Sequence, residues 1–429
     1  MSTRRTFLHT SAATAALAAR KIEPLAMNGG SKGVTTPAAR HGAIVKWPRY
    51  DAADKQAVLD LMESNRYYQE IPLLEKETMA HTGVPYAKAH CNGTSALMSM
   101  FFAANLPAGS EILVPSYTAS ATIVPMRFFG LVPVFVDIDP RTACFDLEHA
   151  AKVLTPRCRA LVPMHSWGRP CDMDEIASLA RQHGLMVLED AAQAQGASLR
   201  GKLMGAWGAA AIFSYQTSKV LPAIEGGMGL YQNQELYERA TAFGNYDLPA
   251  SFPKDSKYRK YHDTGFGPKF RIHPLAAAIA RRQLTVLDKR NALVRDQTAG
   301  LNARLTQLPG LSAQAGRKDM QRVHWASNIL FFDAAKAGFS KEILLKALAA
   351  EGVRAAAAPY PEQHRFAIYR EAQWWHHAPV VPEVLPGCAQ VNKSAMRLPL
   401  FSEEAPELIE QYGAAFEKVW AHRDSLARG

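Results

Sequence analysis

Residues 187–193 read Val-Leu-Glu-Asp-Ala-Ala-Gln, a short apolar run that ends in carboxylates. A run of this length bounded by small and polar residues is typical of a buried strand, and Asp190 stands at its end. A carboxylate there can hold a heteroaromatic ring nitrogen in its protonated form through a charge-assisted hydrogen bond. The alternative is that Asp190 is only the N-cap of a following helix, a position where Asp is also favoured.

On both sides of this stretch, short apolar runs alternate with helical patterns. This alternation predicts an α/β fold whose mainly parallel sheet is covered by helices, with ligands bound at the carboxyl ends of the strands. The expected strands are Glu111–Val114, Val132–Val136, Ala160–Pro163, Met186–Leu188, Ala209–Phe213 and Met228–Tyr231. The expected helices between them are Thr94–Asn105, Ala119–Phe129 and Asp174–His183, preceded by a helix that Asp51 caps.

The pattern predicts two domains. A long helix after His273-Pro274 leads into a C-terminal part with expected strands at Asn328–Phe332 and Val353–Ala356. That part also has helical patterns at 340–350 and from a cap at Ser402 to about Ala421. We therefore expect a large domain over residues 34–290 and a smaller α/β domain over residues 291–429.

Composition excludes several classes of protein. The chain has 429 residues, of which 48% are apolar and 21% charged, which is ordinary for a globular protein and unlike a disordered or collagen-like chain. No apolar run approaches the roughly 20 residues of a membrane helix, so we expect no membrane span. Five scattered cysteines form neither a metal motif nor a disulfide framework.

Residues 1–33 resemble a twin-arginine export signal. Arg4-Arg5 precedes Phe7-Leu8 and a weakly apolar stretch, and Ala16-Leu17-Ala18 offers a cleavage site. The pattern predicts a periplasmic protein; the alternative is an Ala-rich helix that stays attached in the cytoplasm. This segment holds five basic residues against one acidic residue, so it supplies four of the ten excess positive charges. The body is then only mildly basic, and we expect no nucleic-acid partner.

Two further segments carry chemistry. Asn92-Gly93-Thr94-Ser95 opens a helix with a glycine and two hydroxyls, and free N–H groups at a helix start bind anions. Phe213-Ser214-Tyr215-Gln216-Thr217-Ser218-Lys219 follows another strand. A lysine that is desolvated there has a lowered pKa and an amine able to form a Schiff base, although a surface lysine is the simpler alternative.

Together the three segments predict a site for pyridoxal 5′-phosphate (PLP). Gly93, Thr94, Ser95 and Ser214 would hold the phosphate, Asp190 the ring nitrogen, and Lys219 the aldehyde. Lys219 and Asp190 are the predicted catalytic residues, and no metal is expected.

The chain resembles the DegT/StrS-type PLP-dependent sugar aminotransferases, which have the aspartate aminotransferase fold (fold type I). The resemblance spans about residues 44 to 420 and is carried by "NGTSAL", "PVFVDIDPRT", "WGRPCDMDEI", "VLEDAAQAQGA" and "SYQTSKVLPAIEGGMG". It implies that Gln193 contacts the 3-hydroxyl of the cofactor. It also implies a homodimer with shared active sites and a role in amino-sugar or polysaccharide biosynthesis.

Two positions depart from the family pattern. An aromatic residue that stacks on the cofactor usually follows the Thr of the "T-aromatic" step, but here Ala119 follows Thr118, so the stacking is lost or Tyr117 provides it. The family's "N-[YF]-R" triplet, whose Asn reaches the phosphate in the partner subunit, here begins with Lys269. We expect Lys269 to bind that phosphate as a point charge.

The resemblance implies ping-pong transfer of an amino group from L-glutamine or L-glutamate to a keto-sugar or keto-cyclitol. Glu225-Gly226-Gly227 and Gln216 favour the glutamine-using cyclitol branch, although Pro222-Ala223-Ile224 stands where that branch usually has Thr-x-Gly. The basic cluster at residues 254–260 would suit a nucleotide-linked acceptor, or is a solvated loop. The alternatives are a non-catalytic PLP-binding sensor and a dehydratase of the same fold, which would have His in place of Lys219.

Overall fold

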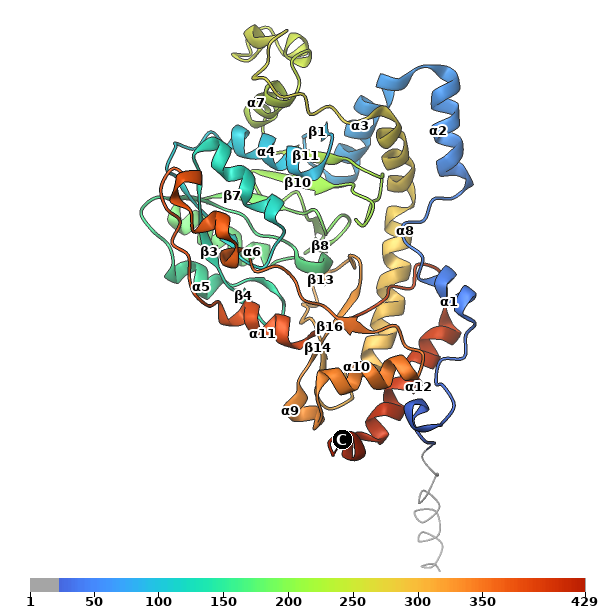
Figure 1. Ribbon diagram of the computed structural model, residues 1–429. Helices are drawn as coiled ribbons and strands as arrows, with labels where there is room; N and C mark the ends of the chain where they lie inside the picture. Colours follow the sequence, from blue (N-terminus) through green and yellow to red (C-terminus); the bar gives the residue numbers. More distant parts are fainter. Residues whose placement is uncertain (1–22, 429) are drawn as a thin grey trace, which may run out of the picture.

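The computed structural model describes residues 23–428, which form a large domain built on one sheet and a smaller C-terminal domain (Figure 1). The strand order of the large sheet is β1-β11-β10-β7-β6-β2-β3. Strands β10, β7, β6, β2 and β3 pair in parallel, whereas β11 runs antiparallel to both β10 and β1. The mainly parallel α/β fold is therefore confirmed. The strands are β1 (Tyr86–His90), β2 (Glu111–Pro115), β3 (Val132–Val136), β6 (Cys158–Leu161), β7 (Met186–Asp190), β10 (Ala210–Ser214) and β11 (Gly227–Tyr231).

Helices cover both faces of this sheet because its strands are apolar on both sides. Successive residues of β2 show this, since Leu113 packs into the core on one face and Ile112 and Val114 pack into the core on the other. The first core includes residues of α3 (Glu70–Thr82), α6 (Met173–His183) and α8 (Pro274–Leu305). The second includes residues of α4 (Gly93–Ala104), α7 (Gln234–Gly244) and α11 (Pro386–Ser394). Also present are α2 (Ala52–Ser64) and α5 (Leu147–Lys152).

The long helix α8 joins the large domain to the small one, as the sequence predicts (Figure 1). The small domain is an antiparallel sheet in the order β12-β14-β16-β15. Its strands are β12 (Leu311–Ala313), β14 (Asn328–Phe332), β15 (Ala356–Ala357) and β16 (Ala395–Leu398), and its helices are α9 (Ala334–Ala337), α10 (Lys341–Ala350), α12 (Pro406–Ala421) and α13 (Arg423–Leu426). Small strand pairs complete the fold: β4 (Ile138–Asp139) with β5 (Cys144–Phe145), and β8 (Ser198–Leu199) with β9 (Lys202–Leu203) and β13 (Met320–Gln321).

Three local expectations were wrong. Residues 119–129 form two 3₁₀ helices, Ser120–Thr122 and Val124–Phe129, because Pro125 and the β-branched residues before it disfavour a continuous α-helix. Ser402 does not cap α12, which begins after Ala405. The hydroxyl of Ser402 instead donates to the carbonyl oxygens of Ile44 and Lys46, both at 2.9 Å. The strand expected at Val353–Ala356 is replaced by β15, which covers only Ala356–Ala357. Strands β1 and β16 were not expected from the sequence.

The N-terminal segment packs on the small domain and not on the large one. Leu25, Val34 and Ile44 belong to the same hydrophobic core as α12, and α1 (Ala38–Ile44) lies beside it. The fully buried carboxylate of Glu351 accepts hydrogen bonds from the N–H groups of Ala26 (2.7 Å) and Gly33 (2.8 Å). Residues 24–44 therefore pack on the small domain through Leu25, Val34 and Ile44. We had expected residues 34–44 in the large domain and residues 24–33 in an export signal. The paired arginine of that signal lies outside the described residues.

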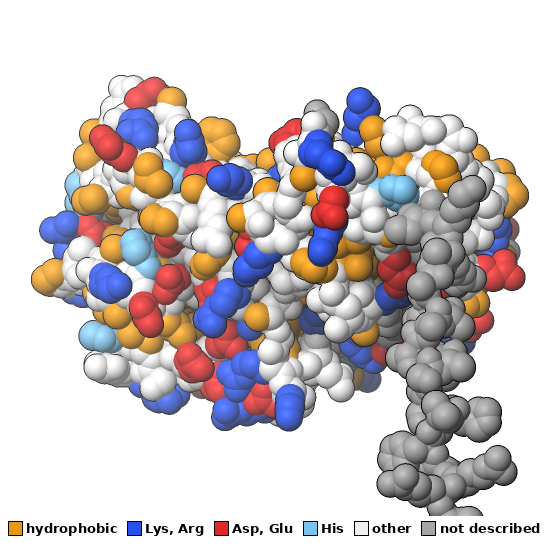
Figure 2. Space-filling view, turned by 90° about the horizontal axis from the view of Figure 1, so that it is seen from below, with side chains coloured by type: hydrophobic (Ala, Val, Ile, Leu, Met, Phe, Trp, Pro, Cys, Tyr) orange, Lys and Arg blue, Asp and Glu red, His pale blue; other side chains and the backbone are white. Residues whose placement is uncertain are grey.

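Basic and acidic side chains are interspersed on the face of the molecule viewed from below (Figure 2). Charged side chains of the described residues also form ion pairs: the guanidinium of Arg317, for example, pairs with Asp174 at 2.8 Å and with Asp319 at 2.9 Å. Over residues 23–428, no helix is both long enough and apolar enough to cross a bilayer.

Candidate active site

The carboxyl ends of β1, β7 and β10 lie at one edge of the sheet, and the loops that follow them surround a cavity of about 460 Å³. Six of the eight predicted site residues line this cavity: Gly93, Thr94, Asp190, Gln193, Ser214 and Lys219. Ser95 and Lys269 do not line it. Residues that are 126 positions apart in the sequence thus share one cavity because β1 and β10 are both neighbours of β11.

The start of α4 forms one end of the cavity. Asn92 caps this helix, since its side chain accepts from the N–H of Ser95 at 2.8 Å. The N–H groups of Gly93 and Thr94 have no hydrogen-bond partner in the described chain, so they are free to bind an anion. A Cβ on Gly93 would lie 2.8 Å from the Cβ of Ser214, so only glycine allows the helix start to approach the end of β10 this closely.

Ser95 has a structural role in this cap. Its hydroxyl donates to the carbonyl oxygen of Asn92 at 2.8 Å and accepts from the N–H of Asn92 at 3.1 Å. The side chain is buried and is occupied within the helix start. Ser95 therefore shapes the anion-binding turn, and the described geometry gives it no free donor toward the cavity.

Asp190 is the last residue of β7, as predicted, and its carboxylate faces the cavity. Its Oδ2 accepts a hydrogen bond from Oγ1 of Thr122 at 2.7 Å, and its Oδ1 accepts from the N–H of Ala192 at 3.1 Å. The side chain is buried. Two donors thus hold a buried carboxylate in one orientation, and each oxygen retains a free lone pair.

Lys219 lies five residues after β10, in the loop that joins β10 to β11. Burial lowers the pKa of its amine below the ordinary value, and the carboxylate of Asp190 opposes this shift. The Nζ atom lies 4.5 Å from the ring centroid of Trp325, which comes from the small domain. Burial therefore makes the neutral, nucleophilic form of this amine more accessible than in an ordinary lysine.

Gln193 is oriented at both ends of its side-chain amide. Its Oε1 accepts from the N–H of Trp167 at 2.8 Å, and its Nε2 donates to the hydroxyl of Tyr360 at 3.1 Å. One N–H of the amide remains available on the cavity side. Trp167 itself has a positive φ of 57°, a conformation that the neighbouring loop must hold in place.

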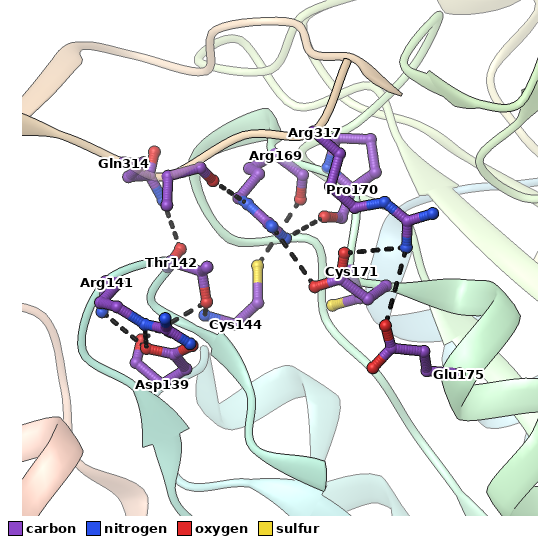
Figure 3. A network of polar contacts seen from close by, with 12 residues as sticks. Asp139, Arg141, Thr142, Cys144, Arg169, Pro170, Cys171, Glu175, Gln314 and Arg317 are labelled. Atoms are coloured by element: carbon purple, nitrogen blue, oxygen red, sulfur yellow. Dashed lines mark hydrogen bonds and ion pairs between the residues drawn. The ribbon is translucent and has the colours of Figure 1, made fainter. Parts of the chain in front are cut away.

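A polar network joins that loop to neighbouring segments of the chain (Figure 3). Arg169 donates to the carbonyl oxygens of Ala315 (2.6 Å) and Pro170 (2.5 Å), and Gln314 donates to that of Thr142 at 2.8 Å. Segment 313–323 of the chain thereby holds the Trp167–Cys171 loop against the large domain. The orientation of Gln193 depends on this contact.

Of the two residues that depart from the family pattern, Ala119 lies at the cavity and Lys269 does not. Ala119 lines the cavity, whereas Tyr117 is fully buried and its hydroxyl accepts from Nε1 of Trp167 at 3.4 Å. Tyr117 is not among the residues that line the cavity, so it does not replace the missing aromatic. Lys269 is exposed, with Nζ 5.5 Å from the ring centroid of Tyr246.

Sequence reasoning missed Thr122, Trp325 and Tyr360. Thr122 and Tyr360 lie 68 and 167 positions from the residues that they orient. No local pattern marks them, because their roles come from loops that meet only in the folded chain.

The fold and this constellation define a PLP-dependent aminotransferase of fold type I. The model of the DegT/DnrJ/EryC1/StrS aminotransferase family matches residues 48–417, and the chain belongs to this family.

Several relatives are similar over most of the chain. L-glutamine:2-deoxy-scyllo-inosose aminotransferase of Streptomyces fradiae is 30% identical over 95% of this chain and 100% of its own length. 3-Amino-5-hydroxybenzoate synthase of Amycolatopsis mediterranei is 33% identical over 63% of this chain and 70% of that protein. Among solved structures, an aminotransferase from Psychrobacter cryohalolentis has a TM-score of 0.79 at 25% identity, covering 88% of this chain and 99% of that one.

Proposed function

We propose that this protein transfers an amino group from L-glutamine or L-glutamate to a keto-cyclitol or keto-sugar, with PLP bound in the cavity at the sheet edge. The observation that carries the proposal is the position of Lys219 and Asp190 on one cavity whose end is an anion-binding helix start. PLP, when bound, would supply a ring that acts as an electron sink and an aldehyde carbon that carries the amino group from one substrate to the next.

The residues present fit this cofactor. The free N–H groups of Gly93 and Thr94, with the hydroxyls of Thr94 and Ser214, suit a phosphate. The carboxylate of Asp190, held by Thr122 and Ala192, suits a protonated ring nitrogen at the other end. The remaining N–H of Gln193 suits the 3-hydroxyl between them.

Lys219 would perform the chemical work in both half-reactions. Its amine would hold PLP at the aldehyde carbon. Once released, the same amine would act as the base that moves a proton from the Cα of the donor. The second half-reaction runs these steps in reverse on the ketone of the acceptor.

A cyclitol or free-sugar acceptor is supported by the full-length similarity to an inosose aminotransferase and by the Glu225-Gly226-Gly227 segment. A nucleotide-linked acceptor would draw on the basic cluster at residues 254–260. In this structure Lys257 of that cluster pairs with Glu235 at 2.5 Å, which reduces its free charge. We therefore favour the cyclitol or free-sugar class.

We also propose a homodimer in which Lys269 approaches the phosphate of the partner subunit's site. Two observations support this proposal: Lys269 is exposed, and it lies away from the cavity of its own subunit. Sedimentation analysis tests the dimer, and the Lys269 variant described below tests the shared site.

For localisation we propose export of the folded, cofactor-loaded protein through Arg4-Arg5. Because residues 24–34 pack on the small domain, cleavage would have to fall before them, as at Ala16-Leu17-Ala18. Changing Arg4-Arg5 to Lys-Lys should trap the protein in the cytosol. Uncleaved cytosolic protein from the unaltered gene would contradict export.

The decisive experiment follows the absorbance of the PLP-loaded protein during addition of L-glutamine or L-glutamate. A transaminase converts to the pyridoxamine form, and adding the correct ketose restores the first spectrum with formation of an amino product. A spectrum unchanged by every amino acid would contradict the proposal and favour a PLP-binding sensor. A panel of keto-cyclitols, free keto-sugars and nucleotide-linked keto-sugars then identifies the acceptor class.

A further inference from the structure

The fold brings together two cysteines that are 27 positions apart in the sequence. Cys144 lies in β5, and Cys171 is the last residue of the Trp167–Cys171 loop that precedes α6. Their side chains lie next to each other (Figure 3). Both belong to the same hydrophobic core, and both are at most 2% exposed. The two thiols therefore form a buried pair that the spacing of the cysteines in the sequence does not reveal.

Contacts between the two segments hold the sulfur atoms close to each other. Sγ of Cys144 lies 3.7 Å from the carbonyl oxygen of Arg169, on the loop that carries Cys171. Sγ of Cys171 lies 3.2 Å from the carbonyl oxygen of Met164 and also faces the backbone N–H of Phe145, the neighbour of Cys144. When Cys144 loses its proton, the thiol of Cys171 donates a hydrogen bond to its sulfur. The two sulfurs are thus within hydrogen-bond reach.

The surroundings of the pair make the two thiols unequal. The hydrogen bond from Cys171 lowers the pKa of Cys144, burial opposes this shift, and the positive charge of Arg169 adds to it. Burial and the neighbouring Cys144 raise the pKa of Cys171. A thiolate is the nucleophilic form of cysteine, and a thiol beside it can complete a disulfide. Cys144 is therefore the favoured nucleophile and Cys171 the group that resolves the first product.

We propose that Cys144 and Cys171 form an intramolecular disulfide when the folded protein meets hydrogen peroxide. The Cys144 thiolate attacks one peroxide oxygen, the O–O bond breaks, and the other oxygen leaves as hydroxide, which takes up a proton to become water. The sulfur of Cys171 then bonds to Sγ of Cys144 while the new S–O bond breaks. The released hydroxide takes the proton of Cys171 as a second water. The two thiols lose two electrons in total, and the peroxide gains them.

This bond would tie the Trp167–Cys171 loop to β5. The N–H of Trp167 in that loop donates to Gln193 at 2.8 Å, so the disulfide would restrain a loop that orients a residue of the PLP cavity. A disulfide also restricts the unfolded chain, so we expect the oxidised protein to unfold at a temperature that is higher by a few degrees. This modification does not depend on which amino donor and acceptor the enzyme uses.

The test treats the folded, PLP-loaded protein with a small molar excess of hydrogen peroxide. The remaining thiols are then blocked in denaturant, and the tryptic peptides are mapped by mass spectrometry without reduction. Peptides 142–152 and 160–181 contain the two cysteines and should appear as one crosslinked species that a reductant separates. Oxidised glutathione is the control oxidant, because it is too large to reach thiols that are this deeply buried and should form the crosslink far more slowly.

Cys171→Ala should abolish both the crosslink and the rise in unfolding temperature. The matched control is Cys158→Ala, which removes another buried thiol from the same core and should keep both effects. The peptide map of the wild type needs no variant, so the test still decides if Cys171→Ala does not fold.

The inference would be overturned if peptides 142–152 and 160–181 stay unlinked while peroxide oxidises Cys91, a free cysteine that is less buried than the pair. Equal rates of crosslinking with hydrogen peroxide and oxidised glutathione would also overturn it, since the thiols would then react in the unfolded chain. A crosslink between Cys144 and any cysteine other than Cys171 would do the same.

Discussion

The hydroxyl of Thr122 donates a 2.7 Å hydrogen bond to Oδ2 of Asp190, although the two residues lie 68 positions apart in the sequence. Because its one hydrogen goes to Asp190, Thr122 accepts a 2.7 Å hydrogen bond from the hydroxyl of Thr118. This chain of two hydroxyls orients the carboxylate that faces the cavity. The carboxylate of Asp190 is therefore held by the hydroxyl of Thr122 and by the backbone N–H of Ala192.

Thr122→Val should reduce turnover while keeping the shape of the side chain. A hydrogen bond to a charged group contributes about 1.5–3 kcal/mol, so we expect a loss of roughly 10- to 100-fold in the rate of the donor half-reaction. Asp190→Asn should lose more, because it removes the charge itself. Ser120→Ala, which removes a nearby hydroxyl bound to Gln363, is the matched control. Normal turnover in Thr122→Val would mean that Asp190 needs no lateral support.

Lys219 should react with aldehydes at a lower pH than an ordinary lysine. Only the neutral amine is nucleophilic, and burial lowers the pKa of Lys219, so the rate of PLP capture by the cofactor-free protein should rise with pH and level off below pH 10.5. Stopped-flow absorbance across the pH range measures this profile. Lys219→Ala should abolish borohydride-trapped cofactor, and trapping at another lysine would contradict the assignment.

Lys269→Ala should weaken PLP binding several-fold at low salt, and less at high salt, if Lys269 reaches the partner's phosphate. Equilibrium dialysis at two ionic strengths measures the difference. Lys260→Ala serves as the control, because Lys260 is another exposed lysine that lies against a tyrosine ring. An unchanged affinity at low salt would remove Lys269 from the shared site.

Ile224→Gly should stabilise the protein. Ile224 has a positive φ of 68° and a side chain that is 56% exposed, so it bears backbone strain with little burial to offset it. The left-handed region costs a β-branched residue about 1–2 kcal/mol, and the greater unfolded-state entropy of glycine offsets about half of this, leaving a gain near 1 kcal/mol. Denaturant midpoints measure the change. Ile224→Ala keeps a Cβ at this φ and should gain little.

The sequence by itself determined the class of fold and the local parts of the site. Asp190 ends a strand as predicted, and Ser214, which was expected directly after a strand, is the last residue of β10. A strand-length apolar run followed by polar residues is a pattern of neighbouring positions, so the sequence alone can show it. The start of α4 at Gly93 and Thr94 was also predictable, because a helix cap is formed by about four consecutive residues.

Only the tertiary structure decided which distant residues complete these parts. Thr122 meets Asp190, Trp325 lies beside Lys219, and the N-terminal segment joins the small domain through Glu351. The contact of Ser402 with the carbonyl oxygens of residues 44 and 46 could not be predicted either, because the local sequence around Ser402 is equally typical of a helix cap. Such contacts depend on how strands cross over and how the two domains close on each other, and that geometry is a property of the whole packed chain.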